Sequence, residues 1–180
     1  MTAHIMLDIE SLGTRPGAII LSAALVRFSD EACVQVNLAI EPQRALGMHS
    51  DPATEQWWST QSPEAWAAAT CNPIPPADAL GFLRDWILWA SPTDEPFVWC
   101  HGATFDAPLL VELYRLLGTV PPWQFWNVRD TRTLYDLAGV NVKDYAVPPP
   151  HIALNDAIGQ TRAANAALRI IAGNRGLVVA

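Results

Sequence analysis

The chain has 180 residues, with only one Lys, three Cys and no apolar run long enough to span a membrane. The Cys residues are odd in number and widely spaced, with no Cys-x-x-Cys pair, so they indicate neither a disulfide framework nor a zinc site. No basic segment followed by an apolar stretch opens the sequence, so no secretory signal is expected. We therefore expect a protein of the reducing cytoplasm with no membrane partner.

The formal net charge is −7, and the shortage of Lys disfavours a protein that holds nucleic acid by bulk electrostatic attraction. A metal enzyme remains compatible with this charge, because its own carboxylates contribute to the count. Hydrophobic residues make up 51% of the chain and eight residues are Trp, which is typical of a packed globular protein. The length fits a single domain over residues 1–180.

The order of the predicted elements indicates an α/β fold with a mixed sheet, because two of the strands follow each other as an antiparallel hairpin. Apart from a short helix at 52–58, the segment 41–72 is expected to be irregular. Gly139 and Gly173 are expected to end the helices at 130–137 and 153–172. We expect strands at 4–11, 18–28, 33–40, 97–101 and 125–128, and helices at 52–58, 79–90, 107–117, 130–137 and 153–172.

Two carboxylates one residue apart, Asp8 and Glu10, interrupt the first apolar run. Alternate side chains of a strand share a face, so both acids emerge on the same side. Two buried carboxylates repel each other and are costly to desolvate, and a divalent cation such as Mg²⁺ or Mn²⁺ relieves both costs. The alternative is a strand end that reaches solvent with both acids hydrated.

Two further acids begin predicted helices, and each has an ordinary alternative. Asp106 follows a strand, where catalytic groups gather in such sheets, but it could instead cap the helix. Asp156 lies in the first or second turn of the last helix, where the helix dipole alone favours an acid. Together with the first pair they make four carboxylates that could converge on two metal ions.

A pair of ions activates water and stabilises the leaving oxygen in phosphoryl displacement. Such chemistry needs a base. His151 stands five residues before Asp156 and has a suitable unperturbed pKa of about 6.5. The alternative for His151 is a histidine in a surface loop.

These residues resemble the motifs of DEDDh 3′–5′ exonucleases of the RNase T / DnaQ-like superfamily, which have a ribonuclease-H-like fold. The Trp57–Trp58 pair with Gln61, the stretch 123–126 and the stretch 129–133 resemble more narrowly a branch that includes phage exonuclease A and a mycobacterial exoribonuclease. The matching superfamily motifs are Asp8–Glu10, Gly102–Asp106 and His151–Asp156.

The resemblance implies a mixed five-stranded sheet flanked by helices and a metal-dependent 3′–5′ exonuclease that releases nucleoside 5′-monophosphates from RNA or DNA. It assigns Asp8, Glu10, Asp106 and Asp156 to two divalent cations, Mg²⁺ or Mn²⁺, and it makes His151 the general base. Nucleic acid is the implied partner, and a homodimer is compatible with the resemblance.

The same resemblance suggests contacts to substrate. Leu12 and Gly13 match positions that wedge and cradle the terminal base, and His101 stands where the superfamily usually has an Asn that positions sugar or phosphate. Phe105 and Trp57 could stack on a base, with the core as the alternative place for each. Arg129 belongs with Asp130 and Arg132 to a mixed-charge cluster that could form a wall of the substrate groove or a structural ion-pair network.

Two other functions remain as alternatives. One is a catalytically inactive nucleic-acid-binding module on the same fold, which the intact set of four acids and His151 disfavours. The other is an endonuclease on the same fold, which a mobile base at His151 disfavours.

Overall fold

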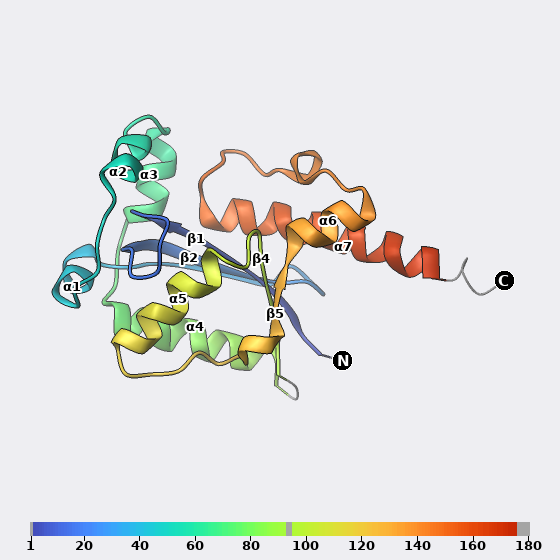
Figure 1. The fold of residues 1–180 in the computed structure, drawn as a ribbon, viewed down its shortest axis with the longest axis horizontal. Coiled ribbons are helices and arrows are strands. Elements are labelled where there is room, and N and C mark those ends of the chain that lie inside the picture. Colours follow the sequence, from blue (N-terminus) through green and yellow to red (C-terminus); the bar gives the residue numbers. More distant parts are fainter. Residues whose placement is uncertain (1, 93–94, 176–180) are drawn as a thin grey trace.

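A five-stranded mixed sheet with the order β3-β2-β1-β4-β5 organises the computed structural model, which describes residues 2–92 and 95–175 (Figure 1). Strands β1, β2 and β3 pair antiparallel, whereas β4 and β5 continue the sheet parallel to β1. This confirms the predicted fold class. The strands are β1 (His4–Ser11), β2 (Ile20–Arg27), β3 (Cys33–Asn37), β4 (Phe97–Cys100) and β5 (Val128–Asp130).

Helices cover both faces of the sheet, and each face has its own hydrophobic core. One core includes residues of α3, α4 and α5, and the other includes residues of α6 and α7. In the part of the chain that the structure describes, no helix is both long and apolar enough for a membrane span. The helices are α1 (Ile40–Ala45), α2 (Pro52–Trp58), α3 (Pro63–Thr70), α4 (Pro76–Ala90), α5 (Asp106–Leu116), α6 (Thr131–Ala138) and α7 (Ala153–Arg175), with 3₁₀ turns η1 (Phe125–Asn127) and η2 (Val142–Tyr145).

The central strand β1 separates the two cores by alternation. Leu7 and Ile9 belong to the core beneath α4 and α5, whereas Met6 belongs to the core beneath α6 and α7. Asp8 and Glu10 have the same spacing as Met6, so both acids face α7. This confirms the predicted shared face of the two acids.

The segment 41–72 is more regular than predicted, because it contains α1 and α3 in addition to the expected α2. Helix α3 has a clear start signal: the Ser62 hydroxyl accepts a hydrogen bond from the Ala65 backbone N at 3.1 Å, and Pro63 opens the helix. In α1, the buried Gln43 side chain both donates to and accepts from the Ile20 backbone at 2.8 Å. That long-range pairing ties α1 to β2 and is invisible in local sequence.

Several other boundaries differ from the prediction, and α4 for example begins at Pro76 instead of at residue 79. The predicted strand 125–128 is a 3₁₀ turn followed by β5, because pairing with β4 begins only at Val128 and the side chains of Phe125 and Trp126 are 82% and 58% exposed. Strand β3 ends at Asn37, before α1 begins. Helix α7 continues through Gly173, since a helix tolerates one Gly at a cost of about 1 kcal/mol. Gly139 ends α6 in the left-handed conformation, as predicted.

Candidate active site

Asp8 and Glu10 lie near the carboxyl end of β1, and both side chains are nearly buried. The Asp8 Oδ1 atom accepts a hydrogen bond of 2.7 Å from Nε2 of Gln160 on α7. Asp106 is the first residue of α5, with Phe105 at the N-cap, and its Oδ1 accepts a hydrogen bond of 3.3 Å from the Ile9 backbone N. The turn after β4 thus brings Asp106 to the end of β1.

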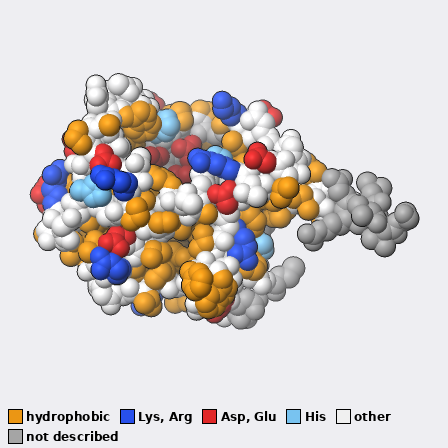
Figure 2. Space-filling model, in the orientation of Figure 1, with side chains coloured by type: hydrophobic (Ala, Val, Ile, Leu, Met, Phe, Trp, Pro, Cys, Tyr) orange, Lys and Arg blue, Asp and Glu red, His pale blue; other side chains and the backbone are white. Residues whose placement is uncertain are grey.

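Asp156 and His151 reach the same place from the start of α7. The backbone N of His151, which has a φ of +62°, donates a hydrogen bond of 2.9 Å to Asp156 Oδ2. Glu10, His151 and Asp156 each offer one potential ligand atom, and these atoms all lie within 4.8 Å of one another. The His151 ring meets the Trp57 ring edge to face, with centroids 4.8 Å apart. In Figure 2, acidic side chains gather in a hollow with His and basic side chains beside them.

Burial is the main cause of raised carboxyl pKa values at this site. It raises the pKa of Glu10 to about 8 and that of Asp106 to about 7, and it raises the pKa of Asp8 well above its usual range. The charge of Asp106, Glu10 and Asp156 raises the pKa of Asp8 further. Burial also raises the pKa of Asp156, against the hydrogen bond from His151. Keeping all four carboxyl groups ionised is therefore unfavourable for the protein without a bound cation.

The donor set fits a divalent cation. Four carboxylates supply the hard oxygen ligands that Mg²⁺ and Mn²⁺ prefer. Within residues 2–92 and 95–175, none of the four carboxylates forms an ion pair with Lys or Arg. Bound cations are thus the natural counter-charge for Asp8, Glu10, Asp106 and Asp156.

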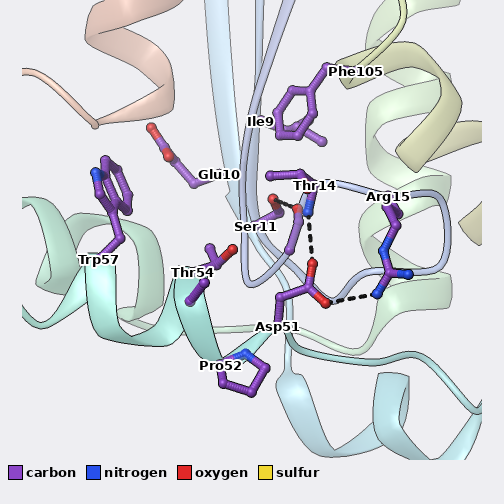
Figure 3. Close-up of a pocket in the computed structure, with 12 residues that line it drawn as sticks. Ile9, Glu10, Ser11, Thr14, Arg15, Asp51, Pro52, Thr54, Trp57 and Phe105 are labelled. Carbon is purple, nitrogen blue, oxygen red and sulfur yellow. Dashed lines mark hydrogen bonds and ion pairs between the residues drawn. The ribbon is translucent and has the colours of Figure 1, made fainter.

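A cavity of about 740 Å³ opens beside Glu10 (Figure 3). Its far wall is the β1–β2 turn, which Asp51 fastens by accepting hydrogen bonds from Thr14 N at 3.4 Å and from Arg15 Nη2 at 3.0 Å. Figure 3 shows Glu10 between Trp57 and Phe105, which come from α2 and from the residue before α5. The cavity therefore has aromatic groups next to the acids and polar groups farther out.

The predicted substrate contacts fall into two groups. Gly13, Phe105 and Trp57 line the cavity, whereas Leu12 does not and is packed into the core. Trp57 is 39% exposed, while its neighbour Trp58 is buried and donates from Nε1 to the Ser11 carbonyl at 2.9 Å.

His101 and Arg129 are held by neighbours outside the cavity. The Nδ1 atom of His101 lies 3.0 Å from Oγ1 of Thr131. Arg129 donates from Nη1 to the carbonyls of Trp126 and Val128, and its guanidinium stacks 4.3 Å from the Phe97 ring centroid. The structure therefore does not bring Arg129 to the acids, and its contacts match the structural alternative without an ion pair.

Gln160, Asp51 and Thr54 were missed from sequence. Gln160 stands four residues after Asp156 on α7, so both lie on one helix face, and that spacing was an available signal. Asp51 and Thr54 carry no such signal, because their place in the cavity depends on how α2 packs against the β1–β2 turn.

A protein-family model described as the 3′-5′ exoribonuclease Rv2179c-like domain matches residues 3–168. The chain belongs to this family. Rv2179c-like membership makes it a metal-dependent 3′–5′ exonuclease, a hydrolase, and confirms the resemblance drawn from the motifs.

Known proteins that are similar to this chain are consistent with this family assignment. A protein named exodeoxyribonuclease from Enterobacteria phage T4 is 27% identical, with 71% of this chain and 68% of that protein covered. The nuclease domain of 3′hExo, a DEDDh family member solved with bound rAMP, has the same fold, with a TM-score of 0.60 at 15% identity over 93% of this chain and 92% of that one. An exonuclease I structure matches with a TM-score of 0.66 at 12% identity and 96% of this chain covered; the Rv2179c-like chain spans 44% of that protein.

Proposed function

We propose that this chain removes nucleotides one at a time from the 3′ end of a nucleic acid strand and releases nucleoside 5′-monophosphates. Asp8, Glu10, Asp106 and Asp156 hold two divalent cations, Mg²⁺ or Mn²⁺. The observation that supports this is the meeting of four carboxylates, three buried and Asp156 half-buried, from three distant segments, with no ion pair to Lys or Arg among the described residues. When bound, two such cations would activate a water molecule and stabilise the leaving oxygen.

His151 takes the proton from the attacking water. Its place beside Glu10 and Asp156 supports this role, because a base must reach the water that the carboxylates help to position. The hydrogen bond from His151 N to Asp156 fixes the loop that carries the imidazole. Gln160 orients Asp8 by donating to one of its oxygens and leaves the other oxygen for a cation.

The cavity beside Glu10 receives the terminal nucleotide. Trp57 and Phe105 offer aromatic surface to the base, and stacking of this kind tolerates any base. Gly13 lines the cavity and lets the β1–β2 turn pack against Asp51, since a Cβ there would lie 3.0 Å from Asp51 Oδ2. His101, near the Asp106 turn, donates to sugar or phosphate. RNA and DNA are both candidate substrates, because the matched family is described as exoribonucleases and the phage relative as an exodeoxyribonuclease.

A product assay tests this proposal. Matched RNA and DNA strands carrying a 5′ label are incubated with the protein and Mg²⁺ or Mn²⁺, beside a closed circular single strand. We expect a ladder that shortens by one nucleotide at a time on linear strands only. Asp156→Asn serves as the inactive control. Equal degradation of circular and linear strands would contradict the exonuclease assignment.

A further inference from the structure

Arg132 lies at the rim of the acid cluster, on the side away from the cavity. It is the second residue of α6, which begins directly after β5, and the parallel pairing of β4 with β5 puts their following turns at one edge of the sheet. Its guanidinium covers Gly102 in the turn after β4: a Cβ built on Gly102 would meet Arg132 Nη1 at 3.4 Å. Gly102 also has a φ of +114°, which favours glycine.

The charge of Arg132 helps to lower the pKa of the neighbouring Asp130, but the two side chains form no ion pair. The Arg132 side chain is exposed, and it makes no ion pair or hydrogen bond with any residue of the described ranges. The adjacent carboxylate of Asp130 is already used: it accepts from Ala103 N at 2.8 Å and from Thr133 N at 2.9 Å, which ties the two turns together. Arg132 lowers the pKa of both Asp106 and His101 through its charge, so it lies within electrostatic reach of the site.

The sheet order gives this arginine a place relative to the substrate. Apart from Phe105, the lining of the cavity comes from the end of β1, the β1–β2 turn and the segment 51–57, whereas Gly102 and Arg132 lie on the β4–β5 side. A strand that has its last nucleotide in the cavity and its scissile phosphate at the acids therefore continues across Gly102 toward Arg132. Because the Arg132 guanidinium fills the space over this glycine, a sugar–phosphate backbone that crosses the turn meets the guanidinium.

We propose that Arg132, packed over Gly102, binds the phosphate that precedes the scissile one, on the strand that the enzyme retains. This inference rests on the proposed function, and it makes Arg132 a positioning residue rather than a catalytic one. A guanidinium suits the task, because its planar set of donors can bind two phosphate oxygens at once. The contact would hold the shortened strand in register for the next cleavage.

The test removes either partner of this contact. One substrate is an oligonucleotide with a single neutral methylphosphonate at the linkage before the scissile phosphate, and its match has an ordinary phosphate there. A third substrate, the p-nitrophenyl ester of thymidine 5′-monophosphate, has a scissile ester and no preceding phosphate. The variants are Arg132→Ala, Arg132→Gln in case the alanine variant folds poorly, and Arg132→Lys. Arg84→Ala is the matched control, because Arg84 is an exposed arginine on α4.

We expect the wild type to lose about tenfold to a hundredfold in kcat/KM, mainly through KM, when the preceding phosphate is neutral. Arg132→Ala or Arg132→Gln loses a similar factor on the ordinary strand, loses nothing further on the neutral one, and cleaves the ester at the wild-type rate. Arg132→Lys recovers part of the loss. The slope of log affinity against log salt falls by about one in the Ala variant. Arg84→Ala behaves as wild type throughout.

Two results overturn the inference while leaving the proposed function intact. One is an equal loss on the ester, which would place Arg132 at the scissile phosphate or in a structural role. The other is a methylphosphonate effect that persists undiminished in Arg132→Ala and Arg132→Gln. A wild-type protein that cleaves none of the three substrates with Mg²⁺ or Mn²⁺ overturns the proposed function itself, and the inference with it.

Discussion

Gln160 on α7 donates a hydrogen bond of 2.7 Å to Asp8 on β1, across 152 positions of the sequence. It bonds one Asp8 oxygen and lowers the pKa of a carboxyl that burial raises. Its own Oε1 is buried and finds no hydrogen-bond partner among the described residues. A buried amide with an unpaired oxygen is costly, so its retention beside the acids points to a role in orienting Asp8.

Replacing Gln160 tests this orientation. Gln160→Ala should lower kcat by about tenfold to a hundredfold and weaken Mn²⁺ binding, because ligands left free to rotate bind metal less well. Steady-state kinetics and calorimetric Mn²⁺ titration measure both effects. Gln124→Ala is the control, since Gln124 is exposed and bonds Glu95 away from the site. Unchanged kinetics in Gln160→Ala would show that Asp8 needs no such support.

Replacing Asp8 should separate activity from stability. Asp8→Asn keeps the shape and removes a carboxyl that on folding must either take up a proton or remain charged in the interior, so we expect activity at background level together with a higher Tm for the metal-free protein at about pH 8. A gain of about 1 kcal/mol corresponds to a Tm shift of about 2–4 °C for a chain of this size. Thermal unfolding in EDTA measures it. Asp85→Asn, at an exposed position on α4, should change neither property.

The pH dependence of stability follows from the same repulsion. In the folded, metal-free protein the pKa is about 8 for Glu10 and about 7 for Asp106, above the values of ordinary unfolded carboxyls. These carboxyls therefore bind more protons in the folded state than in the unfolded state between about pH 4 and pH 8, and they make stability fall as the pH rises through that window. His4 and His101, whose pKa values burial lowers, act in the opposite direction.

We accordingly expect Tm in EDTA to fall between about pH 5.5 and pH 8.5. Added Mn²⁺ should raise Tm more at the upper pH, because a cation binds only the ionised carboxylates. A Tm in EDTA that rises across this window would contradict the burial of unpaired acids. The Asp8→Asn variant should show a shallower fall than the wild type.

Trp57 should act on substrate binding. Trp57→Ala removes the aromatic wall of the cavity, and loss of base stacking costs about 1–3 kcal/mol, so KM should rise about fivefold to a hundredfold. Trp57→Phe should restore most of the affinity. Trp89→Ala is the control, since Trp89 is also exposed but packs on Arg27 instead. Equal effects of Trp57→Ala and Trp89→Ala would point to a general loss of stability.

Much of the fold could be predicted from local sequence signals. The apolar run around Leu7 fixed β1, and its alternation placed Asp8 and Glu10 on one face before any packing was known. Start and stop signals such as Gly139 also acted locally. The stretch 125–126 misled because its aromatic residues imitate a buried strand while facing solvent, and burial is a property of the whole fold.

The surroundings of Arg129 and Arg132 could not be predicted from the sequence. Arg129 and Arg132 are three residues apart and alike in charge, and the sequence placed both in one cluster that could either line the substrate groove or form a structural network. In the structure, Arg129 stacks on the Phe97 ring, whereas Arg132 packs over Gly102. That outcome depends on where β5 gives way to α6 and on the turn after β4, neither of which local pattern specifies.

The sequence by itself indicated which strands and helices carry the four acids and His151, because the residues within each element specify that element. Only the tertiary structure decided their neighbours: Gln160 on Asp8, Asp51 on the β1–β2 turn, and Arg132 over Gly102. These contacts join segments far apart in the chain. They are set by sheet order and helix packing, which depend on the sum of many weak interactions across the fold.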